Sequence, residues 1–427
     1  MRVESTAARP MRLVLVTDEV PRPGLAGHLA VNHAILSHFA ARGHEVIVLL
    51  AQPRLPWPVQ RLAPARLEPA SRVRVEGRGL LRGRGWIAVP PRPALRILAR
   101  QALGLLPVGP RERLRRRARA GEYGLVDAVL GRFLEPAAAD WAAARIADLA
   151  PGAVLVDTIF RAPLLRDPRL AGTRSVLIAH DVFHRRHASL SARGLRLHPA
   201  SLTREEECGL LRLARVVAAI QPEEEALLRA LLPDRRVLCA PMPAVPRPRP
   251  PSVAREPGLL AFVGSDSVHN LDGIRWFLAE VWPLLRRLLP GARLEICGSV
   301  GRALGPGLPR GVRARGIVPD LAPVLHRAAC AVAPVLAGSG LKIKLLDCVA
   351  HGLPVVTTPV GAEGFAPTPD RPFAVATDAE AFAREAARLA ADEAGFARRE
   401  RAALDYCALY APDRVFAALT EAVEETG

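Results

Sequence analysis

Two lysines are candidates for chemistry because the chain otherwise uses arginine as its basic residue. Among 427 residues there are 57 arginines, and Lys342 and Lys344 are the only lysines. They follow the stretch Gly338-Ser339-Gly340 and begin a predicted helix. Glycine backbone, the free N–H groups of a helix start and a compact ammonium together suit a phosphate group. The other interpretation is that both lysines are solvated residues of an ordinary helix.

Asp347 lies one turn beyond Lys344 in this predicted helix. Its carboxylate can accept hydrogen bonds from two vicinal hydroxyls, such as those of a ribose. The segment follows a predicted strand at 330–333, so it should lie at the carboxyl end of that strand, where open α/β sheets bind ligands. It is not a P-loop, because neither serine nor threonine follows the lysines and the glycine spacing differs.

Other polar or glycine residues also follow predicted strands. His180 and Asp181 come directly after one strand, Gly27 belongs to the loop after the first strand, and Glu363 lies between two glycines after the last. A histidine at such a place is either structural or a site residue, and Gly27 alone is a weak signal. Glu363 is either a turn residue or a ligand contact.

The elements that must position these residues alternate between apolar strands and helices. Unbroken apolar runs are typical of parallel strands that are buried on both faces. They predict strands at 12–17, 45–50, 153–156, 175–179, 216–220, 237–239, 259–263, 293–297, 312–315, 330–333 and 354–357. Helices are predicted between them, among them 29–41, 271–289 and 321–327. The pattern indicates two doubly wound, Rossmann-like α/β domains that face a cleft.

The proline-rich segment 241–257 divides this pattern and is predicted to be a semi-rigid linker. We expect an N-terminal domain at 11–240, with an arginine- and proline-rich insertion at about 54–120. A C-terminal domain should cover 258–397, and helices at 398–427 could cross back to the N-terminal domain.

Composition narrows the classes of partner. The formal charge of +17 favours an anionic partner, namely nucleic acid, anionic lipid or a phosphorylated substrate. Nucleic acid ranks last, because aromatic residues, on which bases stack, make up only 4% of the chain. The six cysteines are scattered without a C-x-x-C pair, which is typical of buried thiols in a reducing compartment. The sequence contains no apolar stretch long enough to span a membrane, so we expect a cytoplasmic protein.

The insertion at 54–120 carries a basic run at 111–119 and an apolar stretch at 94–106. One interpretation is a solvated basic helix. The other is contact with anionic lipid headgroups, with 94–106 as an interfacial helix. The second interpretation places the protein at the inner face of the membrane, and it predicts that changing Arg115, Arg116 and Arg117 to glutamine weakens binding to anionic vesicles.

The C-terminal half resembles the nucleotide-sugar-binding domain of group 1 glycosyltransferases (family 4, GT-B fold). The matching motifs occur in the family's order. They are F-V-G at 262–264, Asn270, Gly273, P-G at 290–291, L-E-I-C-G at 294–298, G-I-V-P-D at 316–320, A-P at 333–334, G-S-G at 338–340, K-I-K at 342–344, Asp347, H-G-L-P at 351–354 and G-A-E-G at 361–364. The N-terminal half is similar more loosely, through Gly27, R-G-H-E-V at 42–46, the H-D pair at 180–181, T-R-E-E-E at 203–207 and Q-P-E-E at 221–224.

The resemblance implies a retaining glycosyltransferase that moves a sugar from a nucleoside diphosphate donor to an acceptor hydroxyl, in glycan or glycolipid biosynthesis. It implies neither a metal nor a cofactor beyond the donor substrate. His180 would contact the donor sugar or its phosphate, and Asp181 would orient it. The acceptor would be a glycan or a lipid-linked sugar held by the N-terminal half. The donor-binding residues implied by the matching motifs are Gly27, Gly264, Asn270, Pro334, Gly338, Ser339, Gly340, Lys342, Lys344, Asp347 and Glu363.

The chain departs from the family's pattern at two places. Ser339 and Asp347 stand where relatives often carry two glutamates, and residues 265–270 lack the arginine and lysine of many relatives. The loss of these cations shifts the phosphate-binding role onto Lys342 and Lys344. A glycosyltransferase that has lost activity is therefore one alternative. The others are a nucleotide-sugar epimerase of the same fold, which would turn over donor without acceptor, and a non-catalytic basic binding protein, whose affinity would fall steeply with salt.

Overall fold

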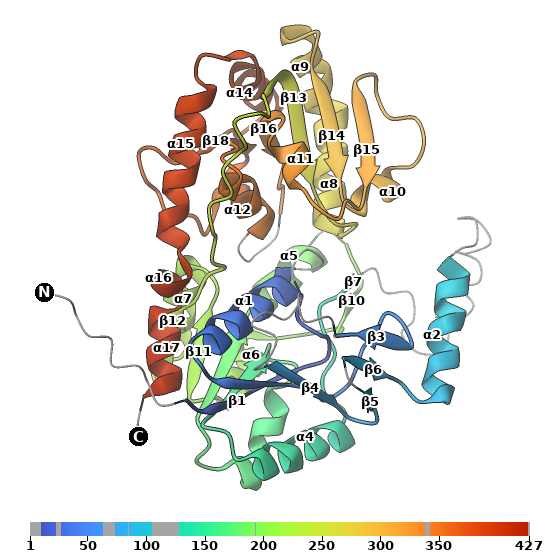
Figure 1. The fold of residues 1–427 in the computed structure, drawn as a ribbon, viewed down its shortest axis with the longest axis vertical. Helices are drawn as coiled ribbons and strands as arrows, with labels where there is room; N and C mark the ends of the chain where they lie inside the picture. Colours follow the sequence, from blue (N-terminus) through green and yellow to red (C-terminus); the bar gives the residue numbers. More distant parts are fainter. Residues whose placement is uncertain are drawn as a thin grey trace, which may run out of the picture. The chain divides into compact units, whose positions relative to one another are not determined.

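The structure is a computed structural model that describes residues 10–22, 27–62, 73–83, 85–104, 128–192, 194–337 and 342–425. The chain divides into two compact units. One contains Met1–Ala240 together with Phe416–Gly427, and the other contains Pro241–Val415. We call them unit 1 and unit 2. Each is built around a parallel sheet with helices, so the predicted fold class of two Rossmann-like α/β domains is confirmed (Figure 1).

The main sheet of unit 1 has seven strands in the order β12-β11-β9-β8-β1-β2-β4, and every neighbouring pair is parallel. Its strands are β1 (Arg12–Thr17), β2 (Glu45–Leu50), β4 (Val73–Gly77), β8 (Ala153–Asp157), β9 (Ser175–Ala179), β11 (Val216–Ala219) and β12 (Arg236–Cys239). The central strands are buried on both faces, which is why the sequence shows them as unbroken apolar runs. Figure 1 shows α1 on one face of this sheet and α4 on the other.

The other elements of unit 1 cover or extend the sheet. The helices are α1 (Gly27–Ala41), α2 (Pro91–Gly104), α4 (Pro136–Leu149), η3 (Ala162–Arg166), η4 (Pro168–Leu170), α5 (Phe183–Ser191), α6 (Arg204–Leu211), α7 (Pro222–Leu231) and α17 (Ala417–Glu424). A three-stranded antiparallel sheet contains β3 (Val59–Arg61), β6 (Trp86–Ala88) and β5 (Leu81–Gly83), and β7 (Ala128–Val129) pairs with β10 (Leu197–His198). The expected insertion at 54–120 is thus partly wrong, because its residues 73–77 form β4 of the main sheet.

The sheet of unit 2 has six parallel strands in the order β15-β14-β13-β16-β17-β18. They are β13 (Glu256–Val263), β14 (Arg293–Cys297), β15 (Val312–Gly316), β16 (Ala328–Ala333), β17 (Val355–Thr357) and β18 (Phe373–Val375). The helices are α8 (Val268–Trp276), η5 (Phe277–Val281), α9 (Trp282–Leu288), α10 (Val300–Leu304), α11 (Ala322–Leu325), α12 (Ile343–Ala350), α13 (Pro359–Ala362), α14 (Ala379–Ala391), α15 (Phe396–Tyr406), η6 (Cys407–Tyr410) and α16 (Pro412–Val415). The proline-rich segment before β13 contains neither helix nor strand.

The helix predicted at 271–289 is present as three joined pieces. The middle piece, η5, is a π-helical turn that ends just before Pro283. Proline has no backbone N–H and cannot donate to the carbonyl four residues earlier, so the α-helical ladder is interrupted there.

A glycine on α8 lets the loop after β16 come close to that helix. A Cβ on Gly273 would lie 1.9 Å from the carbonyl oxygen of Pro334, closer than any real contact. The carboxyl end of β16 can therefore rest against α8 only because residue 273 has no side chain.

We expect Gly273→Ala to lower the free energy of unfolding by about 1–3 kcal/mol, because the added methyl group must push the loop and the helix apart. Gly291→Ala is the matched control in the same unit, since a Cβ there meets nothing within 4 Å. It should change stability by less than about 0.5 kcal/mol. Chemical denaturation followed by circular dichroism measures both, and equal stability of the two variants would contradict the proposed close approach.

Helix α17 belongs to unit 1 although all of unit 2 precedes it in the chain. The side chains of Arg42 and His44 both bind Glu424, with Nε and Nε2 each close to Oε1 at 2.7 and 2.8 Å. The hydrogen bond from Arg42 holds the pKa of Glu424 below its usual range. His38 also reaches this helix through Thr420, at 2.8 Å. The R-G-H-E-V motif at 42–46 thus has a structural role.

The six cysteines are free, as predicted. Five are buried and Cys239 is half-buried. Burial raises the pKa of Cys330 to about 12, so this thiol stays protonated at neutral pH.

Candidate functional site

The predicted donor-binding residues that the structure describes in unit 2 lie at the carboxyl ends of three adjacent strands. Gly264 follows β13, Pro334 follows β16, and Glu363 comes after β17 and the short helix α13. Side chains join the two later loops, because Thr357 Oγ1 donates to the carbonyl of Ala333 at 2.7 Å. The carboxyl edge of a parallel sheet is where such folds bind ligands.

The loop after β13 is held by its own polar groups. The side-chain amide of Asn270 donates to the carbonyl and the hydroxyl of Ser265, at 3.1 and 3.2 Å. Gly298, with φ of +109°, lets the next loop pass close by, since a Cβ there would lie 2.0 Å from the carbonyl oxygen of Gly264. Asn270 therefore orders the loop that Gly264 begins.

The two lysines flank the start of α12 and each faces a carboxylate. The Nζ atom of Lys342, the residue just before the helix, lies 3.9 Å from Oε2 of Glu363, and its side chain is only 8% exposed. The Nζ atom of Lys344 lies 3.2 Å from Oδ2 of Asp347, and both of these side chains are about one-third exposed. The structure thus brings four of the predicted site residues together as two ion pairs at one helix start. Gly338, Ser339 and Gly340 lie outside the described residues.

A second polar cluster lies at the carboxyl ends of β1, β8 and β9 in unit 1. The Nε2 atom of His180 is 3.0 Å from Oδ1 of Asp157 and 3.2 Å from Oδ1 of Asn32, while Thr17 donates to Oδ2 of Asp157 at 2.7 Å. All four residues are buried. Burial by itself would raise the pKa of Asp157, but the hydrogen bond and charge of His180 and the charge of Arg161 hold it below its usual range. Asp157 is therefore an ionised carboxylate at neutral pH.

The contacts of His180 determine the hydrogen-bonding role of each of its ring nitrogens. Both partners of Nε2 are oxygen acceptors, so Nε2 carries a proton. The other ring nitrogen, Nδ1, is buried and has no hydrogen-bond partner among the described residues. In the neutral ring Nδ1 is a hydrogen-bond acceptor, and in the charged ring it is a donor. This nitrogen is the atom that His180 can present to a bound molecule.

Asp181, which was expected to orient His180, does not contact its ring. The carboxylate on the His180 ring belongs to Asp157, whereas Asp181 accepts a hydrogen bond from Arg186. Gly27 is the first residue of α1, the helix that carries Asn32, and it is exposed. Glu207, in the T-R-E-E-E motif, accepts from the backbone N–H groups of residues 183 and 184, each at 2.8 Å, and so fixes the turn that follows His180.

A buried ion cluster adjoins this site and was not predicted. Asp18, directly after β1, forms ion pairs with Arg161 and with Arg54, the latter at 3.2 Å. Burial raises the pKa of Asp18 in spite of these two arginines, and burial also raises the pKa of the neighbouring Glu19. Burial lowers the pKa of His28, whose ring centre lies 6.0 Å from that of His180. Such groups cluster at functional sites. The sequence holds only a weak signal for this cluster, namely that Asp18 directly follows the predicted strand at 12–17.

Solved structures of other proteins share the fold of this chain. The described residues resemble solved structures of the GT-B fold over nearly their whole length. Sucrose-phosphate synthase from Thermosynechococcus elongatus aligns over 96% of this chain and 97% of that one, with a TM-score of 0.65 and 15% identity. TarM aligns over 98% and 100%, with a TM-score of 0.68 and 8% identity. Anabaena HepE, solved with UDP and glucose, aligns over 96% and 98%, with a TM-score of 0.60 and 13% identity. These likenesses identify the fold as GT-B.

Part of the sequence also matches a known protein family. Residues 257–392 match the family described as glycosyl transferases group 1. An uncharacterized 44.6 kDa protein in the cps region of Klebsiella pneumoniae is 25% identical over 126 residues, which cover 27% of this chain. The match spans about a third of that relative, 32% of its length. The family match falls on the unit with the two lysines, and it supports a group 1 glycosyltransferase.

Proposed function

We propose that the chain is a retaining, metal-independent glycosyltransferase of family 4 that transfers a hexosyl group from a nucleoside diphosphate sugar to an acceptor hydroxyl. The observation that carries the proposal is the meeting of Lys342, Lys344, Asp347 and Glu363 at the start of α12, inside the segment that matches the family. The HepE neighbour, which was solved with UDP and glucose, supports a nucleotide-sugar donor.

The charges of unit 2 suit a leaving diphosphate. Lys342 and Lys344 supply two positive charges beside the N–H groups of the α12 start, where the helix dipole also favours an anion. In transfer, the bond between the anomeric carbon and the diphosphate oxygen breaks, and a bond to the acceptor oxygen forms on the same face. The acceptor proton ends on the diphosphate. The two ammonium groups and the helix start stabilise the negative charge that develops on the departing diphosphate. In other transferases a metal ion has this role.

Asp347 and Glu363 fit the remaining parts of the donor. Asp347, one turn beyond Lys344 on α12, can accept from ribose hydroxyls, and Glu363 can accept from sugar hydroxyls. In unit 1, Nδ1 of His180 can contact the transferred sugar or its phosphate, with Asp157 fixing the orientation of the ring.

A thermal-shift screen against UDP, GDP, ADP and TDP sugars tests the donor class. The cognate donor at a hundred times its Kd should stabilise the protein by about 2.7 kcal/mol. A lack of stabilisation by every sugar nucleotide would contradict the proposal. Once a donor is found, a requirement for acceptor distinguishes a transferase from an epimerase, which turns over donor alone.

The acceptor side is proposed to meet an anionic membrane, consistent with a lipid-linked or surface glycan as acceptor at the cytoplasmic leaflet. A helix is present where an interfacial one was expected, α2 (Pro91–Gly104), and it lies beside the small antiparallel sheet (Figure 1). Large apolar side chains are exposed on these elements and just before β3: Trp57, Val59, Leu81, Trp86, Leu95 and Leu98. In the part of the chain that the structure describes, no helix is both long and apolar enough to cross a membrane.

The charge of α2 fits an anionic surface. Leu95 and Leu98 lie three residues apart on one side of the helix, and Arg92 and Arg96 are exposed close by. Aromatic and aliphatic side chains beside arginines are typical of helices that lie in the plane of a membrane surface. Arg115, Arg116 and Arg117 lie outside the described residues, so α2 provides the sharper test.

We expect Leu95→Gln with Leu98→Gln to reduce co-sedimentation with phosphatidylglycerol vesicles about tenfold, because two apolar side chains no longer leave water. Binding of the parent should also fall at moderate salt. Leu288→Gln is the control, since Leu288 is a similarly exposed leucine, at 54%, in unit 2. Equal sedimentation of the parent and the double variant would show that α2 is a solvated helix.

A further inference from the structure

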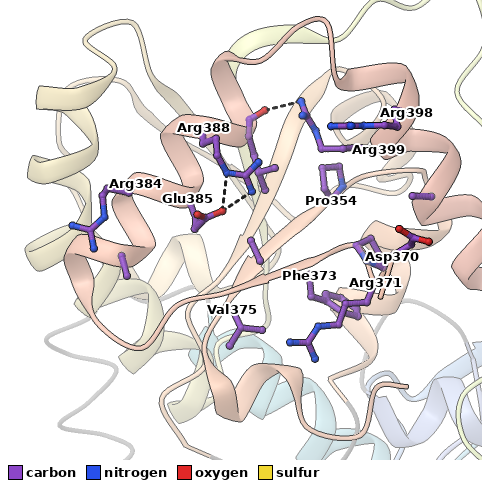
Figure 2. A pocket seen from close by; sticks show the side chains of 15 residues that line it. Pro354, Asp370, Arg371, Phe373, Val375, Arg384, Glu385, Arg388, Arg398 and Arg399 are labelled. Atoms are coloured by element: carbon purple, nitrogen blue, oxygen red, sulfur yellow. Dashed lines mark hydrogen bonds and ion pairs between the residues drawn. The ribbon is translucent and has the colours of Figure 1, made fainter. Parts of the chain in front are cut away.

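A pocket in unit 2 lies along the edge strand β18 and at the amino end of β17 (Figure 2). Its volume of about 570 Å³ is that of a small-molecule site. Pro354, which lines it, precedes β17, whereas Thr358 and Glu363 follow that strand. The pocket is therefore at the other end of β17 from the candidate donor site.

The pocket is strongly basic. Its lining contains five arginines and only two carboxylates, and the arginines come from three elements: Arg371 from the turn before β18, Arg384 and Arg388 from α14, and Arg398 and Arg399 from α15. In Figure 2 the α14 pair lies on one side and the other three on the opposite side. Wherever arginines converge in this way, the field favours an anion.

Neighbouring groups compensate only some of these charges. Arg388 binds Glu385, at 2.5 Å, and Arg399 binds Asp392 across the turn between α14 and α15. Within the described ranges no carboxylate lies at ion-pair distance from Arg371 or Arg398. The two Nη atoms of Arg399 are held by Asp392 and by the carbonyl of Leu389, so this side chain is fixed in the wall of the pocket. The pocket thus holds positive charge that no neighbouring carboxylate of the described residues offsets at Arg371 and Arg398.

We propose that this pocket is a second anion site, separate from the donor site, which binds a phosphorylated small molecule. The planar guanidinium fork matches the oxygens of a phosphoryl group, which it binds through paired N–H donors. Phe373, Val375 and Leu389 form an apolar part of the lining, on which the body of the ligand can pack. Arg371 and Arg398 bind the phosphoryl group, and Arg399, already held by Asp392, adds positive charge beside it.

Titration calorimetry with inorganic pyrophosphate tests the site in the full-length protein. The variant Lys342→Ala/Lys344→Ala, in which the donor site is weakened, isolates the pocket. In this background we expect Arg371→Gln/Arg398→Gln to lower the affinity for pyrophosphate at least about tenfold, because each change removes hydrogen bonds to a charged group. The background makes the result independent of the proposed function, which fails separately if Lys342 and Lys344 have no effect on nucleotide binding.

The matched control is Arg310→Gln/Arg313→Gln, at the opposite edge of the same sheet, where both arginines are exposed. It makes the same change in net charge and should leave the affinity within about twofold. Unchanged affinity in the pocket variant, or an equal loss in the control, would overturn the proposal.

Vesicle binding distinguishes the two possible sources of the phosphoryl group, a lipid headgroup and a free phosphorylated compound. If phosphatidic acid vesicles, compared with phosphatidylcholine vesicles, bind the parent but not Arg371→Gln/Arg398→Gln, the group is a lipid headgroup. If only soluble pyrophosphate depends on the two arginines, it is a free phosphorylated compound. Either result supports the site, and dependence of neither probe on the two arginines overturns it.

Discussion

Lys342→Ala should weaken the binding of the cognate nucleoside diphosphate by roughly tenfold to a hundredfold, the largest loss expected at the donor site. The Lys342 side chain is only 8% exposed, so water screens its ammonium less than it would on an open surface, although Glu363 beside it is about half exposed. Lys344→Ala should cost less, about tenfold, because Lys344 is one-third exposed and already paired with Asp347. Isothermal titration measures both.

The matching nucleoside without phosphate is the control ligand, and its affinity should be unchanged in both variants. Lys342→Arg is the control substitution, since it keeps the charge but places a wider planar group where a point charge fits. It should also bind the diphosphate more weakly. If both alanine variants bind the diphosphate as tightly as the parent, the two lysines are solvated helix residues and the donor site lies elsewhere.

Asp157→Asn should lower kcat by about 10²- to 10³-fold, the largest effect expected on turnover. The asparagine amide can donate to Nε2 of His180, which then has to accept, and the ring proton moves to Nδ1. The atom presented to the substrate thus changes from acceptor to donor without loss of the ring. His180→Ala should lower kcat by about 10²-fold while the nucleoside diphosphate still binds.

His187→Ala is the control, because His187 is a half-buried histidine on α5 whose ring contacts the carbonyl of Ala200 and the hydroxyl of Ser191 and no carboxylate among the described residues. Its kcat should match that of the parent. The far-ultraviolet spectrum and the melting temperature of each variant check that the fold is retained. An unchanged kcat in both Asp157→Asn and His180→Ala would make the buried cluster a structural one.

The sequence predicts the central strands well and the edges poorly. Strands such as β8 and β9 are buried on both faces. Their residues are therefore apolar without interruption, and such runs are easy to recognise in the sequence. β4 contains Arg74 and Glu76 because it is the last strand of its sheet, and the run V-R-V-E-G carries no such signal. The small sheet of β3, β5 and β6 has exposed residues on short strands, which is equally hard to recognise.

The candidate site was predictable where composition singled out a residue. Lys342 and Lys344 stand out because every other basic side chain apart from histidine is arginine. Asp157 does not stand out, since aspartate is common at strand ends, and its contact with His180 depends on β8 lying next to β9. The pair of Asp18 and Arg161 joins residues 143 positions apart, which only the three-dimensional fold brings together.

The position of α17 has a consequence for how this protein is made. Residues 241–415 separate α17 from the rest of unit 1, so a ribosome must synthesise all of unit 2 before Glu424 can meet Arg42 and His44. Until then His38 lacks its hydrogen-bond partner Thr420 and its ring contact with Phe416. Domains made early usually fold during synthesis. Here we expect unit 1 to complete its fold only after residues 417–424 have been synthesised, which follows the synthesis of all of unit 2.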